Sequence, residues 1–363
     1  MHDIPAFMNH SLSRRGILSG TAALAALLTV SACGTGGSQD SASASASATA
    51  GGATDAFPVT IDHAWGQTTI EKAPSRIANS GWSGEDAVLA LGVVPVGIPK
   101  GNYGQLDSNG LLPWTAAALD KLGASGDRLP KIYDETDSIN AEAIADTEPD
   151  LILGVSSGIT KEQYETLSKI APTIPYTSKI AWGASWRDVM TVTAKAMGRT
   201  AQGSSVIADC EKAIAAAVDA HAGLRGKSAA MMYIDPKKLS TISLYTAADS
   251  RSAYLTDLGL TVPASVAQQS QGTDSFYKEI SAENAAVFDD VDIIVVYGDT
   301  ASLLKNLQAD PLLSKIPAIS RGSVAVIQDN SDLAASLSPS VLSIPAQVGA
   351  LVTELAKAAD KVG

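Results

Sequence analysis

Histidine and cysteine are scarce in this sequence of 363 residues, which contains four histidines and two cysteines. His2 and His10 precede an apolar stretch near the amino terminus, which leaves only His63 and His221 in the rest of the chain. A receptor for free zinc or manganese would need several histidines and carboxylates converging on the ion. We therefore expect no metal site built from protein side chains and no resident cofactor.

Motifs for nucleotide binding are also missing, since the chain contains neither a Gly-x-Gly-x-x-Gly fingerprint nor a Walker phosphate loop. Positive charge is short as well, with 26 lysines and arginines against 38 aspartates and glutamates and a formal net charge of −12 at pH 7. Such an acidic protein is not expected to bind nucleic acid or to be drawn electrostatically to an anionic membrane.

One enzyme-like motif is present. The segment Gly154-Val155-Ser156-Ser157-Gly158 fits the Gly-x-Ser-x-Gly pattern of a nucleophile elbow, between an expected strand and an expected helix. A hydrolase of that type needs a histidine later in the chain, and the only candidate is His221, within a predicted helix. A secreted α/β hydrolase using Ser156 is the alternative from another class, but we expect no enzyme and no catalytic residue.

The amino terminus carries export signals. Paired arginines at positions 14 and 15 precede an apolar run from 17 to 30, which is too short to span a bilayer. The pair is typical of a twin-arginine signal, and Val30-Ser31-Ala32-Cys33 has the form of a bacterial lipobox. We predict that residues 1–32 are removed and that a lipid on Cys33 anchors the protein on the extracytoplasmic face of the cell membrane. The alternative is an ordinary secretory signal in which Cys33 is incidental.

Residues 33–55 are almost entirely Ser, Ala, Gly and Thr, a composition that predicts a flexible tether. Removal of the signal takes away two arginines and one aspartate, so the net charge changes from −12 to −13. Anchoring would then depend on the lipid alone. Because Cys33 would be modified, Cys210 has no partner, and no disulfide is expected.

Two halves of the chain share the same order of patterns. The first half contains LALGVVPVGI followed by INAEAIADTEPDLILG, and the second contains LTDLGLTV followed by ISAENAAVFDDVDIIVVYG. Each half predicts a short helix ending in Leu-Gly, a strand, a helix that starts at Ile-x-Ala-Glu, and a buried strand closed by Gly. The strands are continuous apolar runs, as expected for parallel strands covered on both faces.

Between the halves, Thr200–Ala222 has apolar residues at helical spacing and no proline, and Gly223 stands where a helix would end. A helix of this length would extend roughly 33 Å. We therefore predict an α/β protein with two Rossmann-like lobes, residues 56–199 and 224–363, whose mainly parallel sheets are joined by one long helix, residues 200–223. The alternative is a single larger doubly wound domain.

Aromatic residues make up only 5% of the chain, yet many fall in loops that follow predicted strands. Such loops lie at the carboxyl ends of strands, where open α/β sheets bind ligands. Apolar ring faces with polar tips suit a large ligand, and an arginine pairs with an anionic one. For any single aromatic, packing in the core is an equal alternative. The predicted ligand contacts are Trp82, Tyr103, Tyr133 and Trp182 from the first lobe, and Tyr245, Arg251 and Tyr277 from the second.

The lipobox, the tether, the duplicated lobes and the helix between them together resemble the substrate-binding proteins of ABC importers for ferric siderophores, vitamin B12 and haem. The resemblance covers about residues 57–361 and is most specific in NSGWSGEDAVLALGVVPVGI, KIYDETDSINAEAIADTEPDLILG and ISAENAAVFDDVDIIVVYG. The chain is similar in particular to siderophore-binding lipoproteins of actinobacteria. The resemblance implies a monomer that binds an Fe(III)-siderophore complex between two lobes with little hinge motion. Cobalamin and haem remain the alternative ligands.

The same resemblance implies partners in the membrane. In the family, a glutamate on each lobe pairs with arginines of the permease, which in turn works with an ATPase. Glu142 and Glu283 occupy equivalent places in the two Ile-x-Ala-Glu segments. The alternative is that each glutamate only favours the first turn of a helix through the helix dipole.

Overall fold

The computed structural model describes residues 55–363. The predicted export signal, the lipid site at Cys33 and almost all of the predicted tether lie outside the described residues. Within the part described, no helix combines the length and the apolar character needed to cross a membrane.

The first lobe is built on a five-stranded sheet in the order β5-β4-β3-β6-β7, in which every pairing is parallel. All residues of β3, β4 and β6 are buried, as expected for parallel strands covered on both faces. A hairpin of β1 and β2 precedes the sheet, with Val59 opposite Ile70. The bounds are β1 Val59–His63, β2 Gly66–Ile70, β3 Ile77–Asn79, β4 Gly97–Pro99, β5 Lys131–Tyr133, β6 Leu151–Leu153 and β7 Thr173–Ile174.

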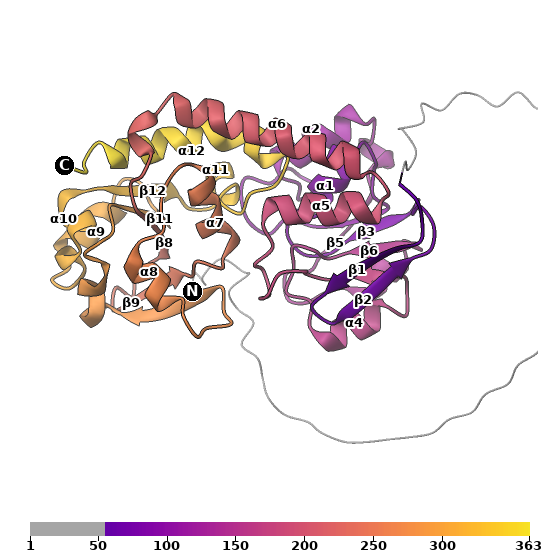
Figure 1. Cartoon of the computed structure of the whole chain (residues 1–363), viewed down its shortest axis with the longest axis horizontal. Coiled ribbons are helices and arrows are strands. Elements are labelled where there is room, and N and C mark those ends of the chain that lie inside the picture. Colours follow the sequence, from indigo (N-terminus) through magenta and orange to yellow (C-terminus); the bar gives the residue numbers. More distant parts are fainter. Residues whose placement is uncertain (1–54) are drawn as a thin grey trace, which may run out of the picture. The chain divides into compact units, whose positions relative to one another are not determined.

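Helices follow these strands and cover the sheet (Figure 1). Their bounds are α1 Glu85–Ala90, α2 Pro113–Lys121, α3 Ala141–Ala145, α4 Lys161–Leu167 and α5 Trp186–Ala196. The segment 101–128 contains the nine-residue helix α2, with Pro113 in its first turn.

The second lobe contains a sheet of order β10-β9-β8-β11-β12. The β8, β11 and β12 strands pair in parallel, whereas β9 runs antiparallel to both β8 and β10. Its core gathers large apolar side chains such as Met232, Phe288 and Ile294. The bounds are β8 Ala229–Tyr233, β9 Thr241–Tyr245, β10 Tyr277–Ser281, β11 Ile293–Gly298 and β12 Val324–Gln328.

The helical elements of this lobe are α7 Ser250–Asp257, α8 Ala264–Gln269, a 3-10 helix Ala282–Phe288, α9 Leu303–Ala309, α10 Pro317–Arg321 and α11 Asp332–Ala335. The repeat predicted from the sequence is therefore not exact. Its Ile-x-Ala-Glu segment forms an α-helix in the first half but a 3-10 helix in the second. The strand expected after Leu258-Gly259 is reduced to one bridge between Ser228 and Thr261, because Pro263 follows and has no N–H for a ladder.

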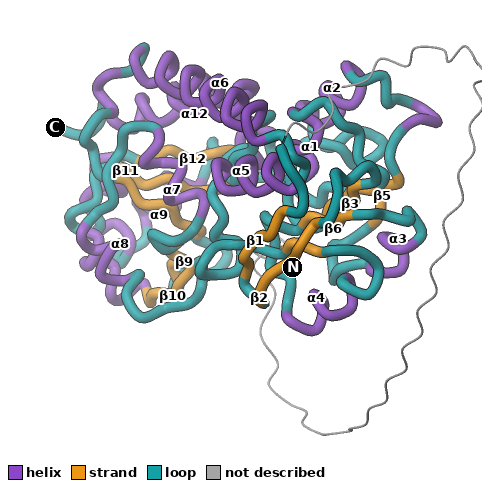
Figure 2. The backbone as a smooth tube through the Cα atoms, turned by 45° about the vertical axis from the view of Figure 1, so that its right-hand side comes forward, coloured by secondary structure: helices purple, strands orange, loops and turns teal. Residues whose placement is uncertain are grey.

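The linking helix α6, Thr200–Asp219, packs against α5 and against the terminal helix α12, Ser343–Ala359 (Figure 1, Figure 2). Two α/β lobes with mainly parallel sheets and one long helix between them confirm the predicted fold class. The predicted end of the helix is wrong, because α6 stops at Asp219 and Gly223 lies inside a separate 3-10 helix, Ala222–Leu224.

The two lobes are also connected by direct contacts. After β12 the chain passes along the first lobe before it enters α12. There Asp329 accepts a 2.7 Å hydrogen bond from Tyr103 Oη, and the amide of Gly104 donates to Asn330 at 2.8 Å. Further on, Ser340 donates to Asp86 of α1. The segment 329–341, placed in the second lobe by the sequence, therefore supports both.

Candidate functional site

The loop that follows β3 carries Trp82 and is fixed by its own backbone. Gly81 has a φ of +92°, and a Cβ there would lie 2.3 Å from the carbonyl oxygen of Ser156, so only glycine fits. The Trp82 amide donates to that same oxygen at 2.9 Å. From the other side, Glu135 accepts hydrogen bonds from Gly81 N at 3.1 Å and from Ser80 Oγ at 3.0 Å. Trp82 is thus held between the loops that follow β5 and β6, which lie on opposite sides of β3 in the sheet.

Three carboxylates lie beneath this loop. Burial raises the pKa of Glu135 to about 7 and that of Asp86 to about 6, and burial also raises the pKa of Glu85 well above its usual value. Asp86 accepts hydrogen bonds from Thr115, at 2.8 Å, and from Ser340. No ion pair with lysine or arginine joins these carboxylates in the described chain.

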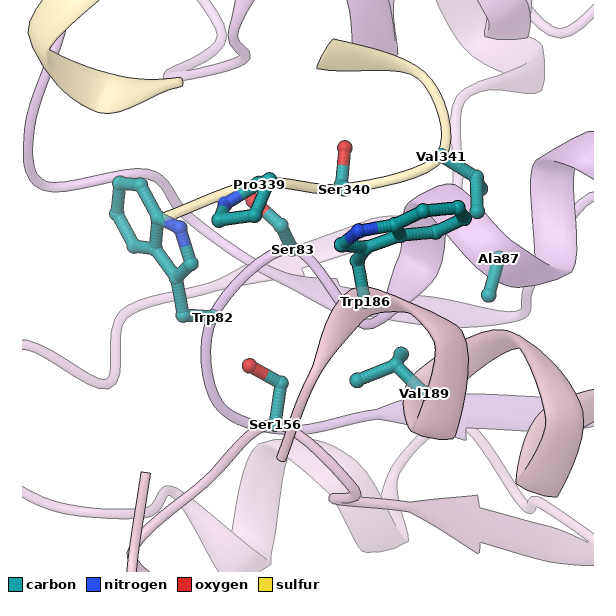
Figure 3. A pocket seen from close by; sticks show the side chains of 9 residues that line it. All are labelled: Trp82, Ser83, Ala87, Ser156, Trp186, Val189, Pro339, Ser340 and Val341. Carbon is teal, nitrogen blue, oxygen red and sulfur yellow. The ribbon is translucent and has the colours of Figure 1, made fainter. Parts of the chain in front are cut away.

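Trp82 also borders a small cavity of about 10 Å³, room for about one water molecule (Figure 3). Trp186, at the start of α5, forms another wall, and the segment after α11 forms a third (Figure 3). The cavity therefore gathers side chains from four separate parts of the sequence, since Ser156 lines it as well. Its lining is Trp82, Ser83, Ala87, Ser156, Trp186, Val189, Pro339, Ser340 and Val341.

The Gly-x-Ser-x-Gly motif has a structural role, because it forms a turn that packs against the ring of Trp182. The φ of Trp182 is +64°, a strained value for a non-glycine residue, and its amide donates to Ser157 O at 3.0 Å. A Cβ on Gly158 would lie 2.5 Å from Trp182 Nε1, so this glycine makes room for the indole. Ser157 Oγ is bonded to Gly154 O at 2.5 Å, and Ser156 lines the cavity next to Trp82. The motif builds a turn that seats an indole ring.

The second lobe contributes a buried arginine. Arg251, only 4% exposed, donates to Asp249 from Nε at 2.8 Å and from Nη2 at 2.6 Å. Its guanidinium lies 4.1 Å above the ring of Tyr245 and 5.6 Å from that of Phe276. Burial alone would lower the pKa of Arg251, but the charge of Asp249 outweighs it, and the pKa is raised. The arginine is therefore always charged.

Two polar atoms in this cluster have no hydrogen-bond partner among the described residues. They are Nη1 of Arg251 and Oη of Tyr245, both buried. Buried polar atoms are almost always hydrogen-bonded, so an unpaired donor beside an unpaired hydroxyl indicates a place for a ligand or water.

Tyrosines connect this cluster to the first lobe. The ring of Tyr297, at the end of β11, lies 6.4 Å from that of Tyr245 and 6.1 Å from that of Tyr103, edge to face in both pairs. Tyr103, which is 8% exposed, belongs to the first lobe and is bonded to Asp329 of the returning segment. The predicted contacts Tyr103, Tyr245 and Arg251 are thus brought together.

The other predicted contacts are placed differently. Tyr133 is in the first-lobe core with Ile144 and Ile152, where its hydroxyl donates to Asn79 O and its ring fills the space beside Gly97. This placement gives Tyr133 a packing role. Tyr277 opens β10 opposite Tyr245, half-buried, with its ring 5.1 Å from Phe276.

Several residues at or near the site are not among the ligand contacts predicted from the sequence. Glu135 accepts from Ser80 and Gly81, 55 and 54 positions earlier in the chain, and Asp257 accepts from Trp186, 71 positions earlier. Such separations give no local signal. Asp249 stands two residues before Arg251, a local Asp-x-Arg pattern that would have revealed it. Trp186 and Phe276 follow the pattern used for the predicted contacts, since each is an aromatic residue in a segment expected to be a loop after a strand.

The predicted docking glutamates are both exposed. Glu142 lies in the first turn of α3 and lines a groove of about 440 Å³ together with Asp134, Asp137 and Asn140. Glu283 lies in the first turn of the 3-10 helix Ala282–Phe288 of the second lobe, where its amide donates to Ser281 Oγ at 3.3 Å.

The described residues contain no group of three or more His, Cys, Asp or Glu side chains able to hold a metal ion. His63 is bonded to Thr68 Oγ1 at 2.9 Å and rests on Tyr164, and His221 follows the end of α6. Neither histidine is hydrogen-bonded to Ser156.

Comparison with known proteins identifies the fold and the family. A family model described as periplasmic binding protein matches residues 77–330. The chain belongs to this family. A crystal structure of PiaA from Streptococcus pneumoniae TIGR4 in complex with ferrichrome has 42% sequence identity and a TM-score of 0.79, with 84% of this chain and 99% of PiaA covered.

Two further relatives agree with this result. The probable siderophore-binding lipoprotein YfiY of Bacillus subtilis is 32% identical over 53% of this chain; the match spans about half of YfiY, 51% of its length. The ferric enterobactin-binding periplasmic protein FepB of Escherichia coli is 28% identical over 72% of this chain and 81% of its own. Family membership confirms that the chain is an extracytoplasmic substrate-binding protein and not an enzyme.

Proposed function

We propose that this protein captures a ferric siderophore between its lobes and delivers it to the permease of an ABC importer for iron uptake. The class of function predicted from the sequence, a siderophore- or ferric-chelate-binding protein of such a transporter, agrees with the family and with relatives named for siderophores and ferric chelates. The iron arrives already chelated, and the protein recognises the organic shell.

The observation that carries the proposal is the cluster around Arg251. A permanently charged guanidinium and a tyrosine hydroxyl are buried with unpaired polar atoms, next to the rings of Tyr245 and Phe276. Chelating oxygens of a hydroxamate or catecholate carry negative charge and would accept hydrogen bonds from both. The indoles of Trp82 and Trp182 would meet the same ligand from the first lobe.

The proposed ligand contacts are therefore Trp82, Tyr103, Trp182, Tyr245, Arg251 and Tyr277, together with Phe276. Tyr133 is left out because its ring is in the core. Among ferric siderophores we place hydroxamates of the ferrichrome type first, because the 42% identical PiaA was crystallised with ferrichrome.

A fluorescence titration tests the ligand class. Ferrichrome, a ferric catecholate, ferric citrate, cobalamin and haem are each added to the protein, and the quenching of tryptophan emission is followed. We expect ferrichrome to quench with micromolar or tighter affinity and the iron-free ligand to bind more weakly. Tight binding of cobalamin or haem with no response to any ferric chelate would refute the proposal in favour of those ligands.

For delivery, we propose that Glu142 and Glu283 dock on the permease. Two exposed carboxylates, one on each lobe, match a two-fold symmetric partner, and such contacts weaken with salt. The acidic groove beside Glu142 suits a basic side chain of the permease. Replacing both glutamates with alanine should abolish iron uptake in cells while ferrichrome affinity stays unchanged. Normal uptake by the double variant would leave them as helix-start residues only.

For localisation, we propose a lipid anchor on Cys33 that holds the monomeric protein at the outer face of the cell membrane. Support comes from the lipobox and from the relative YfiY, which is named a lipoprotein. Replacing Cys33 with serine should release the protein from the membrane fraction; continued membrane association would exclude the anchor.

A further inference from the structure

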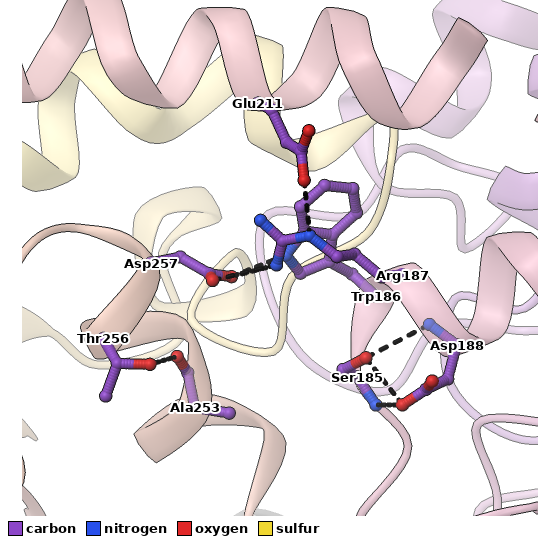
Figure 4. A network of polar contacts seen from close by, with 8 residues as sticks. All are labelled: Ser185, Trp186, Arg187, Asp188, Glu211, Ala253, Thr256 and Asp257. Atoms are coloured by element: carbon purple, nitrogen blue, oxygen red, sulfur yellow. Dashed lines mark hydrogen bonds and ion pairs between the residues drawn. The ribbon is translucent and has the colours of Figure 1, made fainter. Parts of the chain in front are cut away.

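A polar network joins three helices on the side of the molecule where the lobes are linked (Figure 4). Arg187, in the first turn of α5, donates from Nη1 to both carboxylate oxygens of Asp257 at 2.8 Å, and from Nε to Glu211 at 2.8 Å. Trp186 Nε1 donates to Asp257 Oδ2, also at 2.8 Å. The guanidinium lies 4.2 Å from the centre of the Trp186 ring.

These residues come from different parts of the fold. Trp186 and Arg187 belong to the first lobe, Asp257 ends α7 in the second, and Glu211 lies on the linking helix α6. The Asp257 side chain is only 20% exposed and receives two donors from the first lobe, so it is better ordered than an ordinary surface ion pair. We call these four residues the lobe latch.

The latch is connected to both sides of the candidate site. The ring of Trp186 lines the cavity next to Trp82 (Figure 3), while its Nε1 reaches Asp257 (Figure 4). On the other side, α7 is one short helix that holds Arg251 in its first turn and Asp257 at its end. The two residues are six positions apart along the helix, a rise of about 9 Å. Fixing Asp257 therefore fixes the position of Arg251 relative to the tryptophans.

We infer that the lobe latch is a positioning device that sets the distance between the tryptophan side and the arginine side of the ligand site. It touches no ligand itself and acts through Trp186 and through α7. The inference rests on the proposed function in one respect, that the ligand lies between Trp82 and Arg251. A site held at the right width before binding loses less entropy on binding and releases its ligand more slowly.

The test uses Asp257→Ala, with Asp219→Ala as the matched control. Asp219 forms an exposed ion pair with Arg225 beside the end of α6, and this pair does not join α5 to α7. Spin labels on cysteines introduced at the exposed positions 142 and 283 report the distribution of distances between the lobes. Stopped-flow fluorescence reports the dissociation rate of ferrichrome.

In the Asp257→Ala protein we expect a broader distance distribution and ferrichrome dissociation about tenfold faster, the size of a typical coupling between separate sites. The Asp219→Ala protein should match the parent in both, and Asp257→Glu, which keeps a carboxylate, should recover part of the loss.

An unchanged distance distribution in Asp257→Ala overturns the latch, and a broader distribution with an unchanged dissociation rate overturns its positioning role. If the parent protein binds no ferric chelate, the proposed function fails instead, and the same labels still decide whether the latch holds the lobes. The rate is then measured with whichever ligand of the fluorescence panel binds.

Discussion

The two lobes place different charged groups at the candidate site. Beneath Trp82 the first lobe buries Glu85 and Asp86 and half-buries Glu135, and burial raises the pKa of all three. None of the ion pairs found among the described residues involves these carboxylates. The second lobe buries Arg251 against Asp249, so its charge is matched and permanent. The first lobe can therefore lose its charge by taking up protons, whereas the second cannot.

This difference bears on how an anionic chelate would be held. Protonated carboxyl groups do not repel an anion. Glu135 also supports the Trp82 loop, because it accepts hydrogen bonds from Gly81 and Ser80. The guanidinium opposite offers the attraction. The first lobe thus contributes shape and stacking, and the second contributes charge.

The largest effect on stability should follow from removing the carboxylate that pairs with Arg251 in the second lobe. Asp249→Ala leaves the Arg251 charge buried and unpaired, so the free energy of unfolding should fall by about 3–5 kcal/mol. Urea unfolding measures this. Asp219→Ala, which removes an exposed ion pair, should change stability by less than about 1 kcal/mol. Equal effects of the two substitutions would mean that the Arg251 pair is not truly desolvated.

The next effect concerns ligand affinity. Arg251→Ala removes a charged hydrogen-bond donor from the proposed site, so affinity for a ferric hydroxamate should weaken by about 1.5–3 kcal/mol. Titration is done at a temperature where circular dichroism reports the variant folded, because Asp249 loses its partner as well. Unchanged affinity would remove Arg251 from the ligand contacts.

A smaller effect is expected on the tryptophan side. In Gly158→Ala the new Cβ would stand 2.5 Å from Trp182 Nε1, so the indole must move. Affinity should fall by about 0.5–1.5 kcal/mol, the value of one aromatic contact, with little change in stability. Gly223→Ala is the control, since nothing lies within 4 Å of a Cβ there. If Gly158→Ala binds like the parent, Trp182 does not contact the ligand.

The sequence predicted what depends on local pattern. Apolar runs such as Leu151–Leu153 and Ile293–Val296 are visible as buried parallel strands, and the linking helix is visible from its periodicity. Their arrangement in two lobes followed from the repeat. The antiparallel direction of β9 relative to β8 and β10 could not be predicted from the repeat, because strand polarity depends on partners that local sequence does not specify.

The candidate site was predicted only in part for the same reason. Arg251 and Tyr245 follow a strand and meet as expected. Tyr133 follows the same rule, yet its ring turns into the core because glycine at 97 leaves space for it. The hydrogen bond from Trp186 to Asp257 joins residues 71 positions apart, and the local sequence around either residue does not indicate it.

The pH dependence of stability sharpens the contrast in charge between the lobes. Burial raises the pKa of Glu135 from 4.5 to about 7, so between these values the folded protein keeps a proton that the unfolded chain has lost. Lowering the pH from 8 to 5 should therefore stabilise the fold, by at most about 1.4 kcal/mol per pH unit for this proton. Glu135→Gln keeps an acceptor for Gly81 and Ser80 but has no proton to exchange, so its melting temperature should rise less on acidification. Asp86 and Glu85 act in the same direction, so part of the rise should persist. Thermal unfolding at several pH values measures this, with the exposed Glu279→Gln as control. A Glu135→Gln profile parallel to that of the parent would mean that Glu135 is already ionised throughout this range and that the first lobe carries its charge as the second does.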